Sequence, residues 1–235
     1  MLKVQAYASV FGEPSGSPFC VKAMCLLQLS GQDWEIKHTT DPRKAPKGKL
    51  PVLEHDGKVV ADSDDIRDYL ENTFDIDFDK GLSPQERAIS RAVIRMMEEH
   101  VYFALSCDRW VNDENWVHVK QAYFSNMPPI IGGLITNAIR KQVINANKGQ
   151  GLGRHSPTER FQRVKKDIDA VEIILADQPF LFGDFPTAAD VSAVTMLSAC
   201  AAAPVPTDIS KYINQNSGLM AYIKRGRETF YPKAE

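Results

Sequence analysis

The apolar residues of the first 75 positions follow strand spacing and helix spacing in turn. Two short runs, Lys3–Ser9 and Asp33–His38, are typical of β-strands, whereas Pro18–Ser30 has the mostly apolar pattern of a helix that ends at Gly31. The segment Leu50–Asp62 contains two apolar runs around an Asp-Gly turn signal, which predicts a β-hairpin. The predicted order up to this point is β-α-β, a loop, and then β-β.

A further helix follows the hairpin. We predict Ser63 as its N-cap, because a serine hydroxyl can accept a hydrogen bond from the free N–H groups of the first turn. Asp64 and Asp65 then lie in that first turn, where the helix dipole favours negative charge. The apolar residues on one face of this helix are Ile66, Tyr69 and Leu70. These elements together predict a small α/β domain at residues 1–75.

The strand pattern stops after this point, and helical spacing continues toward the end of the chain. A linker, Phe74–Pro84, contains a turn signal and precedes one long amphipathic helix at Gln85–Trp110. The further predicted helices are Glu114–Ser125, Ile130–Asn147, Thr158–Asp177, Ala188–Ala203 and Gln215–Phe230. We therefore predict an all-α domain at residues 83–235.

Two helix starts in this second domain carry capping signals. Ser156 is followed by proline at the first helical position, where the missing N–H costs nothing. Thr187 and Asp190 have the spacing of a capping box, with the acid in the acceptor role. We expect both features to stabilise the fold without contacting a substrate.

The composition mainly excludes classes of function. A formal net charge of −2 and a pI near 6.2 give no strong attraction to nucleic acid or to anionic membranes. No apolar run approaches the ~20 residues that span a bilayer, and no metal-ligand spacing is visible. Four cysteines are scattered along the chain, as in proteins of a reducing compartment: Cys20, Cys25, Cys107 and Cys200. We expect a cytoplasmic protein without a metal, a nucleic-acid partner or a transmembrane segment.

Three features of the α/β domain suggest a binding site. Ser17 and Pro18 lie at the start of the first helix. Pro51 opens a strand of the hairpin, and since proline cannot donate to a ladder, we expect an edge or a special turn with a cis peptide bond. Asp62 and Ser63 lie at the N-terminus of the next helix, where free N–H groups and the dipole favour an anion.

These residues carry a resemblance to a known family. The stretches SPFCVKAMCLLQLSG, KGKLPVLEHDGKVVADS and PTAAD resemble the glutathione transferases, whose fold is a thioredoxin-like α/β domain followed by an all-α domain. The stretches SPFCVK, LSPQERAISRAVIRMMEEHVYF and GLGRHSPTE are similar to the branch that contains the failed-axon-connections proteins, the metaxins and related bacterial proteins. The resemblance covers nearly the whole chain and implies a homodimer.

The resemblance implies that reduced glutathione is the co-substrate and that Ser17 donates a hydrogen bond to its sulfur. Only a few per cent of a free thiol with a pKa of about 8.5 is ionised at pH 7. One hydrogen bond to a charged acceptor is worth about 1.5–3 kcal/mol, and a helix N-terminus adds ~0.3–1 kcal/mol. A hydroxyl at a helix start is therefore enough to ionise much of the thiol without a general base.

The same resemblance implies residues that hold the rest of the peptide: Lys49, Leu50, Pro51, Asp62 and Ser63. The backbone of Leu50, before the proline, would pair with the cysteinyl unit. Asp62 and Ser63 would hold the γ-glutamyl group, although this acid is usually a glutamate, and a shorter acid weakens the contact to the ligand amine. Lys49 would approach the glycine carboxylate.

Simpler structural roles remain open for several of these residues. Ser17 is also what capping alone would select at a helix start. Cys20 follows it with the spacing of a CxxC motif whose first cysteine is a serine, so we expect a packed small side chain rather than dithiol chemistry, with glutathionylation still open. Tyr7 follows the first strand, and we expect it in the core or in a pocket wall.

The long helix at Gln85–Trp110 would face the first domain, so it is a source of pocket residues. The candidates on it for contact with an electrophile are Arg95, Met96, Glu99, Tyr102, Phe103 and Trp110. The alternative for each is an ordinary interdomain core with solvated charges.

We therefore expect a serine-type glutathione transferase that activates the thiol of glutathione for attack on a small hydrophobic electrophile, as in detoxification. The alternative is a non-catalytic binding or scaffold protein of the same fold, since metaxins resemble this branch and fold does not settle function. A glutathione-dependent reductase or lyase would have a cysteine at the position of Ser17, so this third function is disfavoured.

Overall fold

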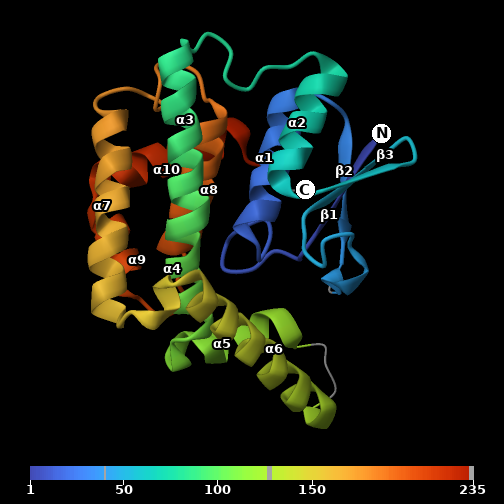
Figure 1. Cartoon of the computed structure of the whole chain (residues 1–235), viewed down its shortest axis with the longest axis vertical. Coiled ribbons are helices and arrows are strands. Elements are labelled where there is room, and N and C mark those ends of the chain that lie inside the picture. The colour runs from blue at the N-terminus through green and yellow to red at the C-terminus, as the bar shows by residue number, and fades with distance from the viewer. Residues whose placement is uncertain (40, 126–128, 233–235) are drawn as a thin grey trace.

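The computed structural model describes residues 1–39, 41–125 and 129–232. Four strands in this part of the chain form one mixed sheet in the order β2-β1-β3-β4 (Figure 1). β1 runs parallel to β2 and antiparallel to β3, and β3 pairs antiparallel with β4. The strands are β1 (Leu2–Ala6), β2 (Trp34–His38), β3 (Val52–His55) and β4 (Lys58–Ala61). The four predicted strands and their order along the chain are thereby confirmed.

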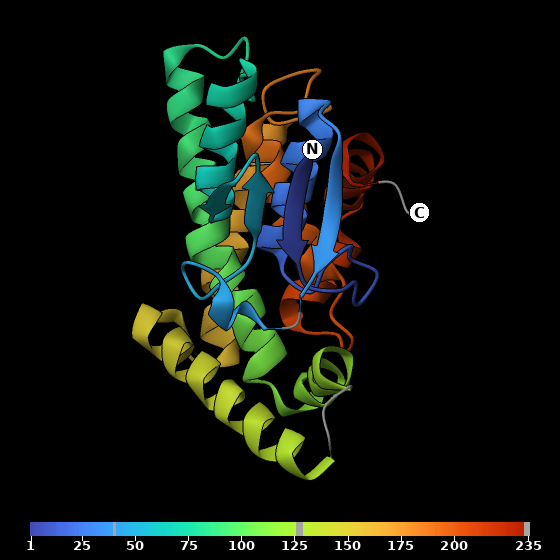
Figure 2. The same cartoon turned by 90° about the vertical axis from the view of Figure 1, so that its right-hand side faces the viewer.

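Helices α1 (Pro18–Ser30) and α2 (Ser63–Phe74) cover one face of the sheet, and Figure 2 shows the strands in front of them. The alternation in β1 follows this arrangement, because Leu2, Val4 and Ala6 are buried while the residues between them are not. α1 also packs against helix α8 (Ala188–Ala201) of the helical part. Because α1 has neighbours on both sides, its apolar residues extend around most of the helix rather than forming one stripe.

The hairpin is formed as its turn signal predicts. Asp56 and Gly57 both have positive φ, 47° and 77°, which is the conformation of a type I′ turn. The Leu50–Pro51 peptide bond is cis, which confirms the expectation from the proline at the strand start.

The helical part follows α2 and lies beside it, with α5 and α6 projecting at one end (Figure 1). Its helices are α3 (Pro84–Met96), α4 (Tyr102–Trp110), α5 (Asp113–Phe124), α6 (Pro129–Gln150), α7 (Pro157–Leu175), α8 (Ala188–Ala201), α9 (Asp208–Gln215) and α10 (Ser217–Phe230). Among the described residues, one short 3₁₀ turn lies between α6 and α7, at Leu152–Arg154, and another lies between β2 and β3, at Pro42–Lys44. None of the helices among the described residues combines the length and the apolar character that crossing a membrane requires.

Three sequence predictions are corrected here. The predicted helix at Gln85–Trp110 is interrupted, because a π-helical turn at Met97–Val101 separates α3 from α4. Helix α9 was not predicted, since it has only 8 residues, too few to show a clear period. The N-cap of α2 is Asp62 rather than Ser63: the chain turns at Asp62, whose carboxylate accepts a hydrogen bond from the N–H of Asp64 at 3.0 Å.

The two predicted capping signals of the helical part are confirmed. Ser156 and Glu159 form a capping box at the start of α7. At the start of α8, the backbone N–H and the hydroxyl of Thr187 both donate to Asp190 at 2.8 Å. Asp190 is fully buried and also accepts hydrogen bonds from the Leu181 N–H and the Tyr222 hydroxyl. This carboxylate therefore connects three segments of the chain besides capping a helix.

Buried residues of both parts form one continuous hydrophobic core, to which β1, α1, α8 and α10 all contribute. Side chains of α1 therefore bury against the helical part as well as against the sheet. The division into domains at residues 75 and 83 stays a prediction.

Replacing Gly226 in α10 by alanine is expected to destabilise the protein by about 1–3 kcal/mol, because overpacking a core forces neighbours out of position. A Cβ at this position would lie 2.7 Å from Cγ2 of Val194 and 2.9 Å from Cζ of Phe230. Urea unfolding measures this change in the free energy of unfolding, provided that the variant has the same m-value as the wild type. The control is Gly149→Ala in α6, where a Cβ meets no atom within 4 Å, so the gain in helix propensity should stabilise by ~0.5–1 kcal/mol. Equal stability of the two variants would contradict the packing at Gly226.

Candidate functional site

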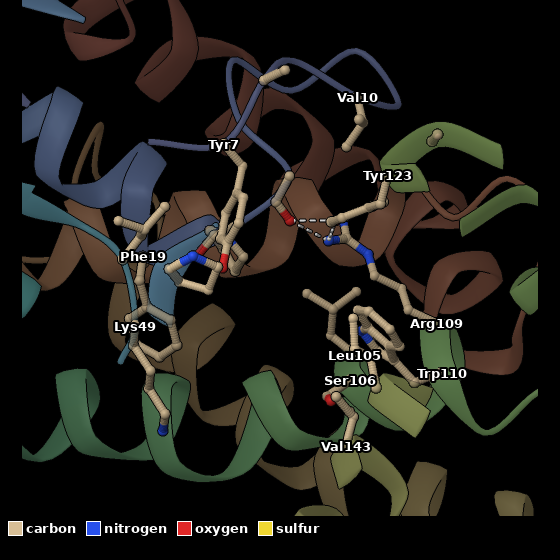
Figure 3. Close-up of a pocket in the computed structure, with 18 of the residues that line it drawn as sticks. Tyr7, Val10, Phe19, Lys49, Leu105, Ser106, Arg109, Trp110, Tyr123 and Val143 are labelled. Atoms are coloured by element: carbon tan, nitrogen blue, oxygen red, sulfur yellow. Dashed lines mark hydrogen bonds between the residues drawn. The ribbon is translucent and has the colours of Figure 1, made fainter. Parts of the chain in front are cut away.

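A cavity of about 380 Å³ lies between the loop that precedes α1, the segment that precedes β3, and helices α4, α5 and α6 (Figure 3). Most of its wall is aromatic or aliphatic: Tyr7, Phe19, Leu50, Tyr102, Leu105, Trp110, Tyr123, Phe124, Ile139 and Val143. The polar side chains on the wall are Ser17, Thr39, Lys49, Ser106 and Arg109. A cavity of this size with few polar groups suits a small, mostly apolar molecule.

Ser17 lines this cavity and is the N-cap residue of α1, but its hydroxyl makes no hydrogen bond to the helix N-terminus. Its φ and ψ of −107° and 122° are extended, as at other N-caps. The simpler role, in which the hydroxyl only caps the helix, is therefore not what the structure shows. The Ser17 side chain remains available to a molecule in the cavity.

Cys20 lies one turn further along α1 and is fully buried. Burial raises the pKa of its thiol to about 11, against the opposing effect of hydrogen bonds to the Tyr7 backbone and to the hydroxyls of Ser17 and Ser15. The thiol therefore stays protonated at neutral pH and is shielded from reagents, as expected of a packed small side chain. Its burial argues against glutathionylation.

The two segments that the resemblance assigns to peptide binding are adjacent in the structure. Leu50 and Lys49 line the cavity, and the carbonyl of Pro51 accepts a hydrogen bond from the N–H of Asp62 at 3.3 Å. Asp62 and Ser63 lie at the N-terminus of α2, outside the cavity wall. Asp62 has a φ of 100°, a conformation that costs a non-glycine residue of order 1–3 kcal/mol and is found most often at functional sites.

Beneath the N-terminus of α2 lies a buried cluster of charges. Lys22 of α1 is fully buried, and its Nζ contacts Asp64 Oδ1 at 2.5 Å and Glu98 Oε1 at 2.6 Å. Glu98 belongs to the π-helical turn and also accepts a hydrogen bond from the hydroxyl of Ser192 at 2.7 Å. These contacts connect α1, α2, the π-helical turn and α8 through one buried ammonium group.

Arg95 belongs to this charged cluster rather than to the cavity, which corrects its prediction as a pocket residue. Its Nη2 contacts Asp64 Oδ2 at 2.7 Å and Glu98 Oε2 at 2.5 Å. Burial acts to raise the pKa of Asp64, but Lys22, Arg95 and Arg91 together lower it to about 2. The face of α3 that carries Arg95 is therefore directed at α2.

Of the other predicted pocket residues, Tyr7, Tyr102 and Trp110 line the cavity. Met96, Glu99 and Phe103 do not: Met96 and Phe103 pack against the hydrophobic core, and Glu99 is exposed and contacts Arg95 at 3.4 Å. The Tyr7 ring reaches into the cavity (Figure 3), and burial raises the pKa of its hydroxyl well above the usual value.

The cavity residues that sequence reasoning missed include Arg109 of α4 and Tyr123 of α5. Arg109 is only 5% exposed, and its Nη1 donates to the carbonyl of Gly16 at 2.9 Å. The Tyr123 hydroxyl donates to the same carbonyl at 2.5 Å (Figure 3). No local signal in the sequence indicates either contact, because both depend on how α4 and α5 pack against a loop about 100 residues earlier in the chain. The described residues contain no cluster of three or more potential metal ligands.

Two family models match the chain. The model for the glutathione S-transferase N-terminal domain matches residues 18–115, and the model for the glutathione S-transferase C-terminal domain matches residues 164–226. The N-terminal match includes the segments around Pro51 and Asp62 and several residues of the cavity wall, such as Tyr102.

The chain is 32% identical over 243 residues to the isoprene-epoxide–glutathione S-transferase of Rhodococcus sp. strain AD45, covering 98% of this chain and 99% of the relative. It is 32% identical over 197 residues to Failed axon connections of Drosophila melanogaster, covering 79% of this chain and 46% of that protein. Metaxins of animals and of a plant match at 20–24% identity. Among solved structures, glutathione transferase GSTFuA3 of Phanerochaete chrysosporium superimposes with a TM-score of 0.69 at 17% identity, covering 99% of this chain and 98% of that one. The last match shows the fold alone.

Proposed function

Since the chain belongs to the glutathione S-transferase family, we propose that it binds reduced glutathione and activates the thiol for attack on a small hydrophobic electrophile. The observation that supports this most is the hydroxyl of Ser17, which lines an apolar cavity at the N-terminus of α1 without capping the helix. A hydrogen bond from this hydroxyl to the sulfur favours the thiolate by about 1.5–3 kcal/mol. The helix N-terminus acts in the same direction.

The neighbouring Cys20 thiol is buried and keeps its proton at neutral pH, so it does not compete with a ligand thiolate for the Ser17 hydroxyl. A hydroxyl has one donor and two acceptor sites, so the Ser17 O–H can be donated to a ligand sulfur. Serine-type chemistry at this site therefore needs no second ionisable group beside Ser17.

The peptide part of glutathione would lie along the segment that joins Pro51 to Asp62. The Leu50 backbone, which precedes the cis-proline, would pair with the cysteinyl unit, and Lys49 would approach the glycine carboxylate. The carboxylate of Asp62 already accepts one hydrogen bond, from the Asp64 N–H. Because a carboxylate has about four acceptor sites, it can still accept from the α-amino group of the ligand, with Ser63 beside it.

The second candidate function is a non-catalytic binding or scaffold role. It is supported by the similarity to metaxins, one of which is described as part of a mitochondrial outer membrane import complex. The resemblance to the transferase family and the four free cysteines support a homodimer in the cytoplasm as part of the favoured proposal.

Calorimetric titration of reduced glutathione into the protein at pH 7 tests the proposal. We expect a dissociation constant of millimolar or below, with release of a proton because the thiol ionises on the protein. The released proton is measured by repeating the titration in two buffers with different ionisation enthalpies. S-methyl glutathione, which has no thiol proton, should bind without that buffer dependence. If neither ligand binds, the scaffold function becomes the better proposal.

A further inference from the structure

The loop at residues 7–17, which connects β1 to α1, carries Ser17 and forms one side of the cavity. Five of its residues line the cavity wall, where Figure 3 shows the first and third of them: Tyr7, Ala8, Val10, Gly16 and Ser17. The carbonyl of Ser17 is held by α1, since it accepts from the Val21 N–H at 3.1 Å, but its hydroxyl makes no capping bond. The direction of that hydroxyl therefore depends on the loop before it.

Glu13 anchors this loop to the helical part of the protein. The residue is only 2% exposed, and its Oε1 accepts from Arg227 Nη1 of α10 at 2.5 Å and from Ser198 Oγ of α8 at 2.6 Å. The hydroxyl of Tyr231, which follows α10, donates to the other carboxylate oxygen at 3.2 Å. Because an unpaired buried carboxylate is costly, these partners determine where Glu13 can lie.

Arg227 also holds the backbone of the same loop. Its Nη2 donates to the carbonyl of Gly12 at 2.9 Å. Gly12 and Phe11 both have positive φ, 76° and 53°, in a turn closed by hydrogen bonds between Val10 and Glu13. This conformation is unfavourable for a bulky residue such as Phe11 and persists only where the surrounding contacts determine it. One guanidinium thus contacts both a side chain and a carbonyl of the loop.

The loop is held from a second side close to Ser17. The carbonyl of Gly16 accepts from Arg109 Nη1 of α4 at 2.9 Å, and the N–H of Gly16 donates to the Ala8 carbonyl at 2.9 Å. The helical part therefore grips the loop at positions 13 and 16, both just before Ser17. The grip at position 13 is an ion pair between residues 214 positions apart in the chain.

Resting on the proposed function, we propose that Glu13 and Arg227 are positioning residues, whose ion pair fixes the loop so that the Ser17 hydroxyl is directed at the sulfur of bound glutathione. Both side chains lie outside the cavity wall and act through Ser17. A hydrogen bond weakens steeply as its angle and distance depart from the optimum, and a misplacement of ~1 Å by a distant mutation can cost ~10²-fold in rate. The acidity of the bound thiol then depends on a contact between the two ends of the chain.

The variant that tests this role is Arg227→Met, which removes the ion pair and the contact to the Gly12 carbonyl. We expect kcat/KM for conjugation of glutathione to 1-chloro-2,4-dinitrobenzene at pH 7 to fall about 3- to 30-fold, a part of the effect of losing the Ser17 hydrogen bond altogether. The midpoint of the pH profile of kcat/KM should rise toward the free thiol pKa of about 8.5. A residue that only stabilises the fold would leave this midpoint unchanged.

A second variant covers the case in which Arg227→Met does not fold because it leaves the Glu13 carboxylate unpaired. Glu13→Gln removes the buried charge with little change in shape, and it should move the rate and the midpoint in the same direction. The matched control is Arg225→Met, two residues earlier in α10, whose guanidinium donates to the Pro179 carbonyl at 2.7 Å. This control should leave the midpoint unchanged.

A double-mutant cycle shows whether the ion pair acts through Ser17. Adding Arg227→Met to Ser17→Ala should lower kcat/KM by no more than about twofold, since the hydroxyl that Arg227 positions is already absent. The same fold-loss in both backgrounds would mean that Arg227 acts independently of Ser17, and this would overturn the proposal.

The remaining outcomes separate this inference from the function on which it rests. If folded Arg227→Met and Glu13→Gln keep the wild-type rate and midpoint, the positioning role is wrong, while the activity of the wild type leaves the transferase proposal intact. Wild-type protein that transfers glutathione to no electrophile overturns the transferase proposal and the positioning role with it.

Discussion

Replacing Ser17 by alanine is expected to lower kcat/KM for glutathione conjugation about 10- to 100-fold, because one hydrogen bond to a charged sulfur is worth about 1.5–3 kcal/mol. The loss should appear in the ionisation of the thiol. Bound glutathione in the variant should have an apparent pKa closer to the free value, higher by about 1–2 units than in the wild type. The rate deficit should therefore be largest near neutral pH and shrink as the pH rises through the thiol pKa of the variant.

The pH profile of kcat/KM measures this effect directly, and Ser17→Thr is the matched variant, since it keeps a hydroxyl at the helix start. We expect Ser17→Thr to retain much of the activity and of the low thiol pKa. Because the Ser17 hydroxyl makes no capping bond, the alanine variant should keep its stability to within ~0.5 kcal/mol. If Ser17→Ala retains both the rate and the pH profile, the thiolate donor is a different group, and the Tyr7 hydroxyl in the same cavity is the next to test.

The fold of the first part was predictable because its signals are local. Gly31 ends α1 with a φ of 68°, as its position after the apolar run predicts. The Asp56–Gly57 turn and the proline at position 51 likewise act through backbone preferences that no distant contact overrides. Proline fixes φ and removes a hydrogen-bond donor, whereas glycine makes positive φ accessible at little cost. Such backbone preferences can be recognised without knowing what packs against them.

The position of Glu98 could not be predicted, because it depends on a backbone irregularity, and the contact of Arg95 depends on Asp64, 31 residues earlier in the chain. The pattern from Gln85 to Trp110 is compatible with one regular helix, and nothing in it indicates the π-helical turn at Met97–Val101. That turn carries Glu98, which contacts Lys22, 76 residues earlier in the chain. When no distant partner is known, an acidic side chain on a helix is expected to face the solvent.

The candidate site likewise contains some residues that the sequence predicts and others that it does not. Ser17 was predictable because serine followed by proline marks a helix start, and Tyr102 and Trp110 because the long helix was expected to face the first domain. Arg109 and Tyr123 were not, since their common partner is a backbone carbonyl, which the sequence of side chains does not specify. The close approach of Tyr123 requires the absence of a side chain at Gly16. Glycine is frequent in loops before helices because of its backbone freedom alone, so its presence at position 16 identifies no packing partner.

Replacing Lys22 by methionine is expected to destabilise the protein by about 3–5 kcal/mol at pH 7, because breaking a buried ion pair leaves uncompensated charge. Methionine keeps much of the length and apolar volume of the lysine stem, so the loss reports the charge rather than a cavity. Asp64 and Glu98 would then share only the guanidinium of Arg95, with Arg91 on the exposed side of Asp64. The comparison variant is Arg91→Ala: this side chain is 61% exposed, and its loss should cost no more than ~1 kcal/mol.

The pH dependence of that loss tests the contribution of Asp64. Its pKa of about 2 is below the unfolded value of about 3.9, so its contribution to wild-type stability is complete above the unfolded value and disappears as the pH falls toward 2. Without Lys22 the carboxyl loses the nearest charge that lowers its pKa, and it takes up a proton at a higher pH than in the wild type. The difference in unfolding free energy between the wild type and Lys22→Met should therefore be largest near neutral pH and shrink between about pH 4 and pH 2, as urea unfolding at a series of pH values would show. A difference that stays constant over this range would mean that the lysine stabilises by packing alone, and α1 and α2 would then be held together without the charged cluster.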